Sequence, residues 1–266
     1  MNHLLREHAP ITDAGWALID DEARDRLVAA LAARKVVDFS GPHSWAYSAS
    51  NLGRSAPLAA PGEGVVARRR RVMPLVELRA PFEVSLEELF DAERGALDLD
   101  FASLDAAAHR LAVAENTAVL HGFAAGGITG IVEASPYEPR AVGDGADDYP
   151  RVVARAVEVL LRAGVSGPYA LAIAPDGWTR IVESAERGGH LLLHHLRDIL
   201  GGPVVWAPGC SGGVVVSMRG GDFVFECGED ISVGYHDHDA TVARLYLEES
   251  FSFRINSPDA AVALTA

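Results

Sequence analysis

A segment rich in proline, glycine and alanine separates two β-like stretches, near residues 45–52 and 64–80. In the second stretch Val76 and Leu78 alternate with Glu77, a pattern typical of a strand with one buried face. Together the two stretches predict a long hairpin. Because the tip of such a hairpin has no core of its own, we expect it to reach over a neighbouring molecule. The segment therefore indicates a protein that works in an assembly.

The composition is that of a soluble globular protein, and the charge argues against nucleic acid as a partner. The chain has 266 residues, and its 37 acidic against 23 basic residues give a net charge of −14. Such a chain repels a phosphate backbone unless its basic residues cluster on one face. They cluster once, at Arg68 to Arg71, within a strand pattern, which is a weak nucleic-acid signal.

Nothing in the sequence indicates a membrane or secretion. No apolar run reaches the roughly 20 residues that a bilayer requires, and the first residues lack the order of a signal peptide. The two cysteines, Cys210 and Cys227, form neither a CxxC pair nor a disulfide-rich scaffold. We therefore expect two unpaired thiols and a cytoplasmic protein.

The remaining pattern predicts an α+β fold. Apolar residues at spacings of three and four predict an amphipathic helix over residues 13–34, capped by Thr12 or Asp13. Ser85 to Glu88 form a capping box that begins a helix ending near Gly95. We further predict helices at 103–125, 150–163, 175–186 and 191–200, a loop at 126–149, and strands at 169–174, 204–207, 214–218, 223–227, 231–235 and 242–255.

One motif suggests an enzyme. Residues 209–213 read GCSGG and match GxSxG, and Asp230 and His236 follow Ser211 in the chain order of a serine hydrolase. A nucleophile elbow requires a strand, a sharp turn and then a helix, however, and the residues after GCSGG predict a strand. The motif is more simply a hairpin turn.

Two histidine clusters suggest a metal. His190, His194 and His195 could share a helix face, and His236 to Asp239 read HDHD. Neither cluster has a third partner that the sequence brings near, so we predict an exposed helix start or pore lining for the first and a solvated loop for the second. No metal site is predicted.

Motifs spread over nearly the whole chain resemble the encapsulins, bacterial nanocompartment shell proteins of the HK97 phage-capsid fold. The matching motifs, in chain order, are LxREHAPITDAGWALIDDEA from residue 4, RKVVDFSGP at 34–42, PLVELRAPFEVSLEEL at 74–89, Glu93-Arg94-Gly95, GVSGPYAL at 164–171, RGGDF at 219–223, EDISVGY at 229–235 and LYLEESFSFRINSPDAAVAL from residue 245.

The resemblance implies a division of the chain into the parts of that fold. It assigns the N-terminal helix and the start of the P-domain to 1–42, the E-loop hairpin to 43–80, the P-domain with its spine helix to 81–134, the A-domain to 135–220, and the C-terminal sheet of the P-domain to 221–266. In the family the E-loop lies over an adjacent subunit, and the amphipathic N-terminal helix faces the lumen.

The resemblance also implies a site for a cargo peptide between the N-terminal helix and a P-domain strand. Carried over by position, one wall would be Leu27, Leu31, Arg34, Val37 and Asp38, and the other Ile231, Gly234 and Tyr235. Apolar anchors would enter the groove, while Arg34 and Asp38 would orient the peptide through charge-assisted hydrogen bonds. The alternative is a purely structural role, in which Leu27 and Leu31 only form the core face of the helix.

Two further expectations follow from the resemblance. Arg187, Gly188, Gly189 and His190 fall where the family builds its five-fold pore, and there Arg187 and His190 would favour anions and respond to pH. Some encapsulins stack a flavin on a tryptophan early in the helix at 85–95. Leu86 stands at that place, so no flavin and no other cofactor is expected.

The function implied is a non-catalytic shell that self-assembles into a hollow icosahedral particle. It would enclose a peroxidase or a ferritin-like enzyme, linked to oxidative stress or iron storage, through a terminal targeting peptide. The expected partners are copies of the chain and this cargo enzyme, with no nucleic acid and no membrane. Two alternatives remain at this point: a prophage major capsid protein, and a GxSxG hydrolase that uses Ser211, Asp230 and His236.

Overall fold

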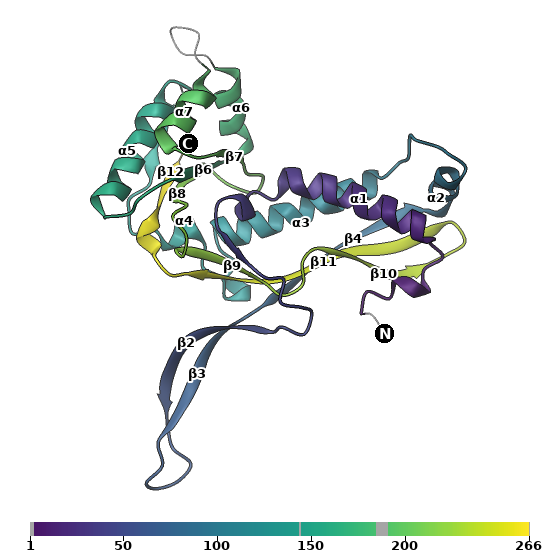
Figure 1. The fold of residues 1–266 in the computed structure, drawn as a ribbon, viewed down its shortest axis with the longest axis horizontal. Coiled ribbons are helices and arrows are strands. Elements are labelled where there is room, and N and C mark those ends of the chain that lie inside the picture. The colour runs from purple at the N-terminus through teal and green to yellow at the C-terminus, as the bar shows by residue number, and fades with distance from the viewer. Residues whose placement is uncertain (1–2, 144, 185–190, 266) are drawn as a thin grey trace.

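The computed structural model describes residues 3–143, 145–184 and 191–265. A lobe of helices packed on a small sheet lies at one end, an elongated sheet covered by two long helices extends from it, and a hairpin projects away from both (Figure 1). The predicted α+β class is confirmed by this arrangement.

The elongated sheet is organised around the 14-residue strand β11 (Val242–Ile255). Strand β4 (Val76–Ser85) runs antiparallel to it over residues 242–251, while β10 (Ser232–His238) and β9 (Phe223–Cys227) are also its antiparallel partners. The short strand β1 (Asp38–Ser40) adds in parallel to β9. Strand β1 was not predicted.

Two helices cover one face of this sheet, α1 (Asp13–Ala30) and the spine helix α3 (Ala102–Leu120). The apolar stripe of α1, including Trp16, Ile19 and Leu27, packs in one cluster with Leu104 and Leu245. The predicted periodicity of α1 is confirmed, and Thr12 caps the helix by accepting a hydrogen bond from the Gly15 backbone at 3.1 Å.

Helix α1 ends four residues earlier than predicted. The cause is the buried side chain of Asn116, whose Oδ1 accepts from the backbone N–H groups of Ala32 and Ala33 at 2.9 Å each. These bonds turn the chain into a 3-10 helix at Ala33–Lys35. The C-terminal end of α1 is thereby fixed to α3, a contact between residues more than 80 positions apart that helical periodicity cannot reveal.

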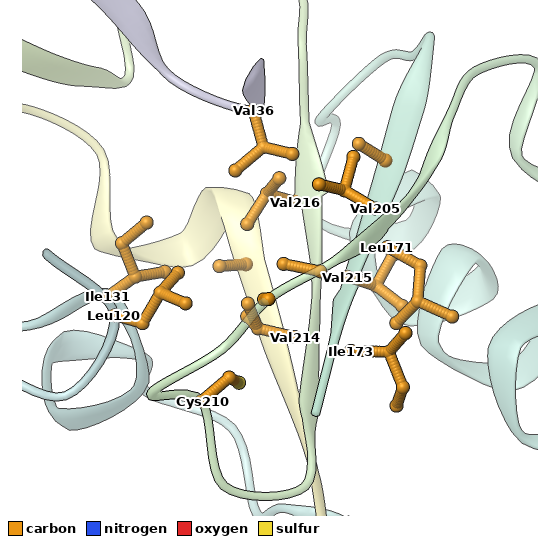
Figure 2. Packing of buried hydrophobic residues seen from close by; sticks show 14 of the residues in the cluster. Val36, Leu120, Ile131, Leu171, Ile173, Val205, Cys210, Val214, Val215 and Val216 are labelled. Carbon is orange, nitrogen blue, oxygen red and sulfur yellow. The ribbon is translucent and has the colours of Figure 1, made fainter. Parts of the chain in front are cut away.

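The second lobe contains a mixed sheet in the order β5-β12-β8-β6-β7. Its strands are β5 (Arg140–Ala141), β6 (Tyr169–Ile173), β7 (Val204–Trp206), β8 (Gly213–Ser217) and β12 (Ala261–Thr265). Every residue of β6 and β8 is buried, and Figure 2 shows Val214, Val215 and Val216 packed among aliphatic side chains from several elements. Strand β12, which the sequence did not predict, pairs with β8 and closes this core.

Five helices complete the two lobes. They are α2 (Leu86–Glu93), α4 (Ile131–Ala134), α5 (Asp148–Arg162), α6 (Pro175–Glu183) and α7 (Leu192–Leu200). Ser85 caps α2 as predicted, by accepting from the N–H groups of Glu87 and Glu88. The predicted loop at 126–149 is wrong where it contains α4 and β5, and Pro150 lies at the third position of α5 rather than the first. Further 3-10 turns lie at Arg6–His8, Ala124–Gly126 and Pro258–Ala260.

The projecting hairpin consists of β2 (Ala49–Leu58) and β3 (Ala67–Pro74), which among the strands that the structure describes pair only with each other. The second predicted β stretch thus contains two strands. Strand pairing is interrupted at Leu75, after which β4 pairs with β11 instead of with the hairpin. Nearly all hairpin residues between 51 and 72 are exposed or half-exposed, so the expectation of a hairpin without its own core is confirmed.

Candidate binding groove

A groove of about 430 Å³ lies between α1 and the start of β10. Its apolar surface comes from Leu27 and Leu31 on one side and from Ile231 and Val233 on the other, with charged groups at its margin. The full lining is Leu4, Arg6, Asp20, Ala23, Arg24, Leu27, Val28, Leu31, Arg34, Asp230, Ile231, Ser232, Val233 and Leu247.

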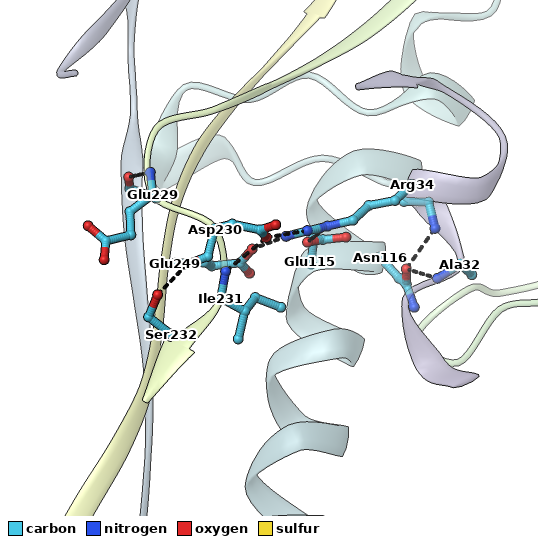
Figure 3. Close-up of polar contacts among 11 residues, drawn as sticks. Ala32, Arg34, Glu115, Asn116, Glu229, Asp230, Ile231, Ser232 and Glu249 are labelled. Atoms are coloured by element: carbon cyan, nitrogen blue, oxygen red, sulfur yellow. Dashed lines mark hydrogen bonds and ion pairs between the residues drawn. The ribbon is translucent and has the colours of Figure 1, made fainter. Parts of the chain in front are cut away.

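One arginine joins the two walls of this groove. The Arg34 guanidinium donates from Nε to Glu115 at 2.6 Å, from Nη1 to Asp230 at 2.5 Å, and from Nη2 to Glu249 at 2.8 Å. Figure 3 shows these three carboxylates converging on Arg34 from α3, from the turn before β10 and from β11. The fork of donors that makes Arg useful for carboxylate recognition is therefore occupied within the chain.

The carboxylates around Arg34 differ sharply in burial. Glu115 and Glu249 are 0% and 1% exposed, whereas Asp230 is 48% exposed at the groove margin. Burial raises the pKa of Glu249 well above its ordinary value, and the adjacent carboxylate of Glu115 raises it further. Burial also raises the pKa of Glu115 despite the opposing effect of Arg34. The two glutamates therefore hold a proton more tightly than exposed ones do.

Asp230 also shapes the second wall. Its carboxylate accepts from the Ile231 backbone N–H at 2.8 Å, and its carbonyl accepts from the Ser232 hydroxyl at 2.8 Å. The same side chain thus pairs with Arg34 and fixes the turn that presents Ile231 to the groove (Figure 3). The position of Ile231 in the groove therefore depends on the same aspartate that pairs with Arg34.

The N-terminal segment closes one end of the groove. The Leu4 carbonyl accepts from the Tyr235 backbone N–H at 2.9 Å, and Leu4 itself is buried in the lining. Arg6 pairs with Asp20 at 2.8 Å and lies over the ring of Trp16 at 4.0 Å. These contacts leave the apolar middle of the groove open and fix its end.

The structure brings together half of the eight residues predicted for a cargo peptide. Leu27, Leu31, Arg34 and Ile231 line the groove. Val37 and Asp38 do not; they line a separate small hollow, where Asp38 accepts a backbone hydrogen bond from Gly221. The expectation that Arg34 and Asp38 orient the same peptide therefore disagrees with the geometry, because the two residues line different hollows.

Gly234 and Tyr235 follow the groove along β10 and are outside its lining. A Cβ on Gly234 would stand 2.2 Å from the ring of Tyr246, so this glycine serves close packing on the sheet face. Sequence reasoning missed Leu4, Asp20, Glu115 and Glu249. A signal for the last existed, because Glu249 occupies a position of the apolar series formed by Leu245, Leu247, Phe251 and Phe253.

The structure does not assemble the hydrolase triad. Ser211 lies in the turn between β7 and β8, so a strand follows it where a nucleophile elbow requires a helix. Asp230 is at the groove, paired with Arg34, and His236 is exposed on β10 beside Arg79 and Arg244. The three side chains line three different hollows, and the GxSxG motif is a turn, as the sequence favoured.

Of the other candidate residues, Arg187, Gly188, Gly189 and His190 lie outside the residues that the structure describes. Within 3–143, 145–184 and 191–265, no group of three or more His, Cys, Asp or Glu side chains is placed to hold a metal ion. The HDHD segment is partly a strand, since β10 continues to His238, which corrects the predicted loop. No helix among these residues is long and apolar enough to cross a membrane.

The hairpin, the spine helix beside a long sheet and the compact second lobe give the chain a capsid-like fold. A virus-like particle from Pyrococcus furiosus has this fold, with a TM-score of 0.63 at 16% identity over 94% of this chain and 99% of that one. The capsid of an empty GTA particle matches with a TM-score of 0.53 at 15% identity, over 89% of this chain and 90% of that one. The HK97-like fold expected from the sequence is thus confirmed.

Sequence relationships identify the family within this class. The family model described as "Encapsulating protein for peroxidase" matches residues 1–252. A type 1 encapsulin shell protein from Rhodospirillum rubrum is 47% identical over 99% of this chain and 96% of its own length, and one from Mycobacterium tuberculosis is 37% identical over the full length of both. The chain belongs to the type 1 encapsulin shell proteins.

Proposed function

We propose that copies of this chain assemble into a closed, hollow shell and that the α1–β10 groove binds a short terminal peptide of an enclosed enzyme. The capsid-like fold and the family support the shell. One observation supports the groove's role above all. An open groove with an apolar middle lies between α1 and β10, and its charged rim is fixed by Arg34, so the site is formed before any peptide arrives.

The chemistry of the groove defines the peptide that it would accept. Leu27, Leu31 and Ile231 call for aliphatic anchors in an extended segment, as in other apolar peptide grooves. The Arg34 fork is paired with buried carboxylates, so charge selection falls to side chains at the margin that are paired within the chain but more exposed. These are Asp230, Arg24 and Asp20. We expect a peptide with apolar side chains at its centre and charged ones at its flanks.

We further propose that the shell itself is not a catalyst and that its cargo is a peroxidase, as the family description suggests; a ferritin-like enzyme is the other candidate. A fluorophosphonate probe tests the first point. We expect no labelling of the shell, whereas labelling that Ser211→Ala abolishes would show a serine hydrolase.

We also expect shells without flavin. Leu86 is buried in the core beneath α1 and offers no ring for stacking. Shells purified without added flavin should show no visible flavin absorbance, and a yellow preparation would contradict this expectation.

The expected cytoplasmic location stays a prediction. The expected absence of nucleic acid also stays a prediction, and it separates a shell from a prophage capsid. Nucleic acid retained by nuclease-treated particles would favour the prophage capsid alternative.

The main experiment has two steps. Light scattering and negative-stain images of the purified chain should show a uniform, hollow, megadalton particle, and a stable monomer or dimer would contradict the shell. Mass spectrometry of particles from the native host then identifies the enclosed enzyme. For the second step, the terminal segment of that enzyme is fused to a fluorescent protein.

Groove variants complete the test. The fusion should copurify with wild-type shells and with Leu18→Ser, which changes a partly exposed leucine of α1 outside the groove. It should be lost with Leu31→Glu, which places a charge in the apolar middle of the groove. Equal retention by shells of both variants would show that the peptide binds elsewhere.

A further inference from the structure

The second lobe contains a hollow that is separate from the peptide groove. Its volume is about 430 Å³, which is the size of a site for a small molecule. The hollow lies between the first turn of α6, the turn that precedes β8 and the last residues of β12. The GxSxG turn belongs to it through Ser211. Among the described residues, none lines both this hollow and the groove between α1 and β10.

The lining combines buried apolar side chains with a few polar groups. Val142, Ile173 and Leu264 line the hollow from the core of the lobe, and all three are buried. Tyr149 and Arg180 line the same space. Sites for small molecules have this character, because apolar walls hold the ligand while a few polar groups fix its orientation.

Tyr149 provides a buried hydrogen-bond donor to this hollow. The residue is 3% exposed, and its hydroxyl makes no hydrogen bond with any part of the chain that the structure describes. A buried tyrosine hydroxyl ordinarily has a partner. The hydroxyl lies against the first turn of α6, since a Cβ on Gly177 would stand 2.7 Å from its oxygen. The donor of Tyr149 is therefore directed into the hollow beside the start of α6.

Arg180 places a positive charge near this hydroxyl. Burial raises the pKa of Tyr149, and the nearby Arg180 guanidinium opposes that rise, so its charge acts on the hydroxyl. Arg180 makes no ion pair within the ranges that the structure describes. Asp176 lies four residues earlier on α6, a spacing at which charged side chains often pair, but no ion pair joins the two. The positive charge of Arg180 is thus available to a ligand.

The beginning of α6 adds two further donors. Pro175 occupies the first position of the helix, and the residue before it is Ala174, whose side chain cannot cap. Among the hydrogen bonds of the described chain, none is donated by the backbone N–H groups of Asp176 or Gly177. Helix N-termini attract anions, because such N–H groups point outward and the helix dipole is positive at this end. These groups and the two side chains above offer donors and positive charge to a single space.

We propose that this hollow binds a small organic monocarboxylate with a compact apolar body. The carboxylate would accept hydrogen bonds from the Tyr149 hydroxyl and the N–H groups of α6, and it would pair with Arg180. The apolar body would pack on Val142 and Leu264. A single charge suits the site better than a phosphate dianion, because the exposed Asp176 at its margin contributes a negative charge of its own. The site goes beyond the shell function and does not depend on the peptide groove.

Ligand-detected NMR on the purified full-length protein tests the proposal, with benzoate as the probe. Benzoate carries one carboxylate on a flat apolar ring, and benzamide has nearly the same shape without the charge. We expect benzoate to bind with a millimolar dissociation constant, as suits a ligand of its size, and benzamide and inorganic phosphate to bind at least roughly tenfold more weakly. Benzoate that does not bind, or that binds no better than benzamide or phosphate, would overturn the proposal.

Paired variants assign the binding to this hollow. Tyr149→Phe removes only the hydroxyl and should weaken benzoate binding by roughly tenfold, equivalent to about 1.4 kcal/mol. Tyr137→Phe, the same change on a half-buried tyrosine outside the hollow, should leave the binding unchanged. Arg180→Gln should weaken binding and Asp176→Asn should strengthen it, whereas Arg155→Gln, on the exposed side of α5, should do neither.

Circular dichroism verifies that each variant is folded. Equal benzoate affinity in Tyr149→Phe and Tyr137→Phe, or in Arg180→Gln and Arg155→Gln, would overturn the proposal. Light scattering of the same samples keeps the result separate from the shell function. Assembled particles that bind no benzoate would refute this site alone. Benzoate binding by a chain that stays monomeric would support the site while the shell function fails.

Discussion

Replacing Arg34 with methionine should destabilise the folded chain more than any other single loss of charge at the groove. The substitution removes three hydrogen-bonded ion pairs and leaves Glu115 and Glu249, 0% and 1% exposed, without a cation. Removing one partner from a buried ion pair costs about 3–5 kcal/mol. For a chain of this size we expect a fall in melting temperature on the order of 10 °C.

The loss should depend on pH in a defined direction. Without Arg34 the two glutamates can relieve their repulsion only by binding protons, so acid should restore part of the stability. The wild type has a weaker dependence of the same sign. Burial holds the pKa of Glu249 above its ordinary value of 4.5 in the folded chain. The proton on Glu249 therefore stabilises the folded chain. This contribution is fully present below about pH 4.5, and it is lost as the pH rises through the higher pKa that Glu249 has in the folded chain.

The assay is thermal unfolding of intact particles between neutral and mildly acidic pH. Arg24→Met is the matched control, because Arg24 also lines the groove but is 64% exposed and, among the described residues, forms an ion pair with Asp21 alone. Exposed pairs of this kind contribute about 0–1 kcal/mol. Adding Glu249→Gln to Arg34→Met should recover stability at neutral pH and flatten the pH dependence. Equal effects of Arg34→Met and Arg24→Met, or a loss independent of pH, would refute the reasoning.

Three further predictions concern other buried positions. Asn116→Ala should lower the free energy of unfolding by about 2–4 kcal/mol in thermal or denaturant unfolding of particles, because its side chain makes four buried hydrogen bonds; a loss below 1 kcal/mol would contradict this. Gly234→Ala should lower the melting temperature through its clash with a tyrosine ring, whereas Gly62→Ala, with open space around it, should not. Burial raises the pKa of both Cys210 and Cys227 to about 12, so a thiol reagent at neutral pH should modify them only after unfolding, and rapid labelling of folded particles would contradict this.

Local sequence patterns predicted the elements whose signals lie within one segment. The spacing of Trp16, Ile19 and Leu27 predicted α1, and strand alternation predicted β11. Two β-like stretches around a segment rich in proline, glycine and alanine predicted the hairpin. The cap at Ser85 predicted the start of α2. Each of these depends on neighbours within about one turn of helix or on side chains of one strand, so no knowledge of the fold was required.

Features that depend on distant partners were not predictable in this way. The early end of α1 follows from Asn116, and the separation of Val37 and Asp38 from the groove follows from that turn and from the pairing of β1 with β9. The Arg34 cluster joins residues 81, 196 and 215 positions apart. Family resemblance located the groove, but only coordinates show that its arginine is already paired.

Strand β11 explains how the sheet can hold two adjacent buried glutamates. Neighbouring residues of a strand point to opposite faces, so Glu249 reaches the helix-covered face and Arg34, while Glu248 reaches the other face. There Glu248 pairs with Arg79, and His3 lies 3.8 Å from it. A strand with one solvated face would leave Glu248 exposed, yet it is 1% exposed. The N-terminal segment therefore covers the second face of the sheet here, and the groove wall that β11 supports is held from both sides.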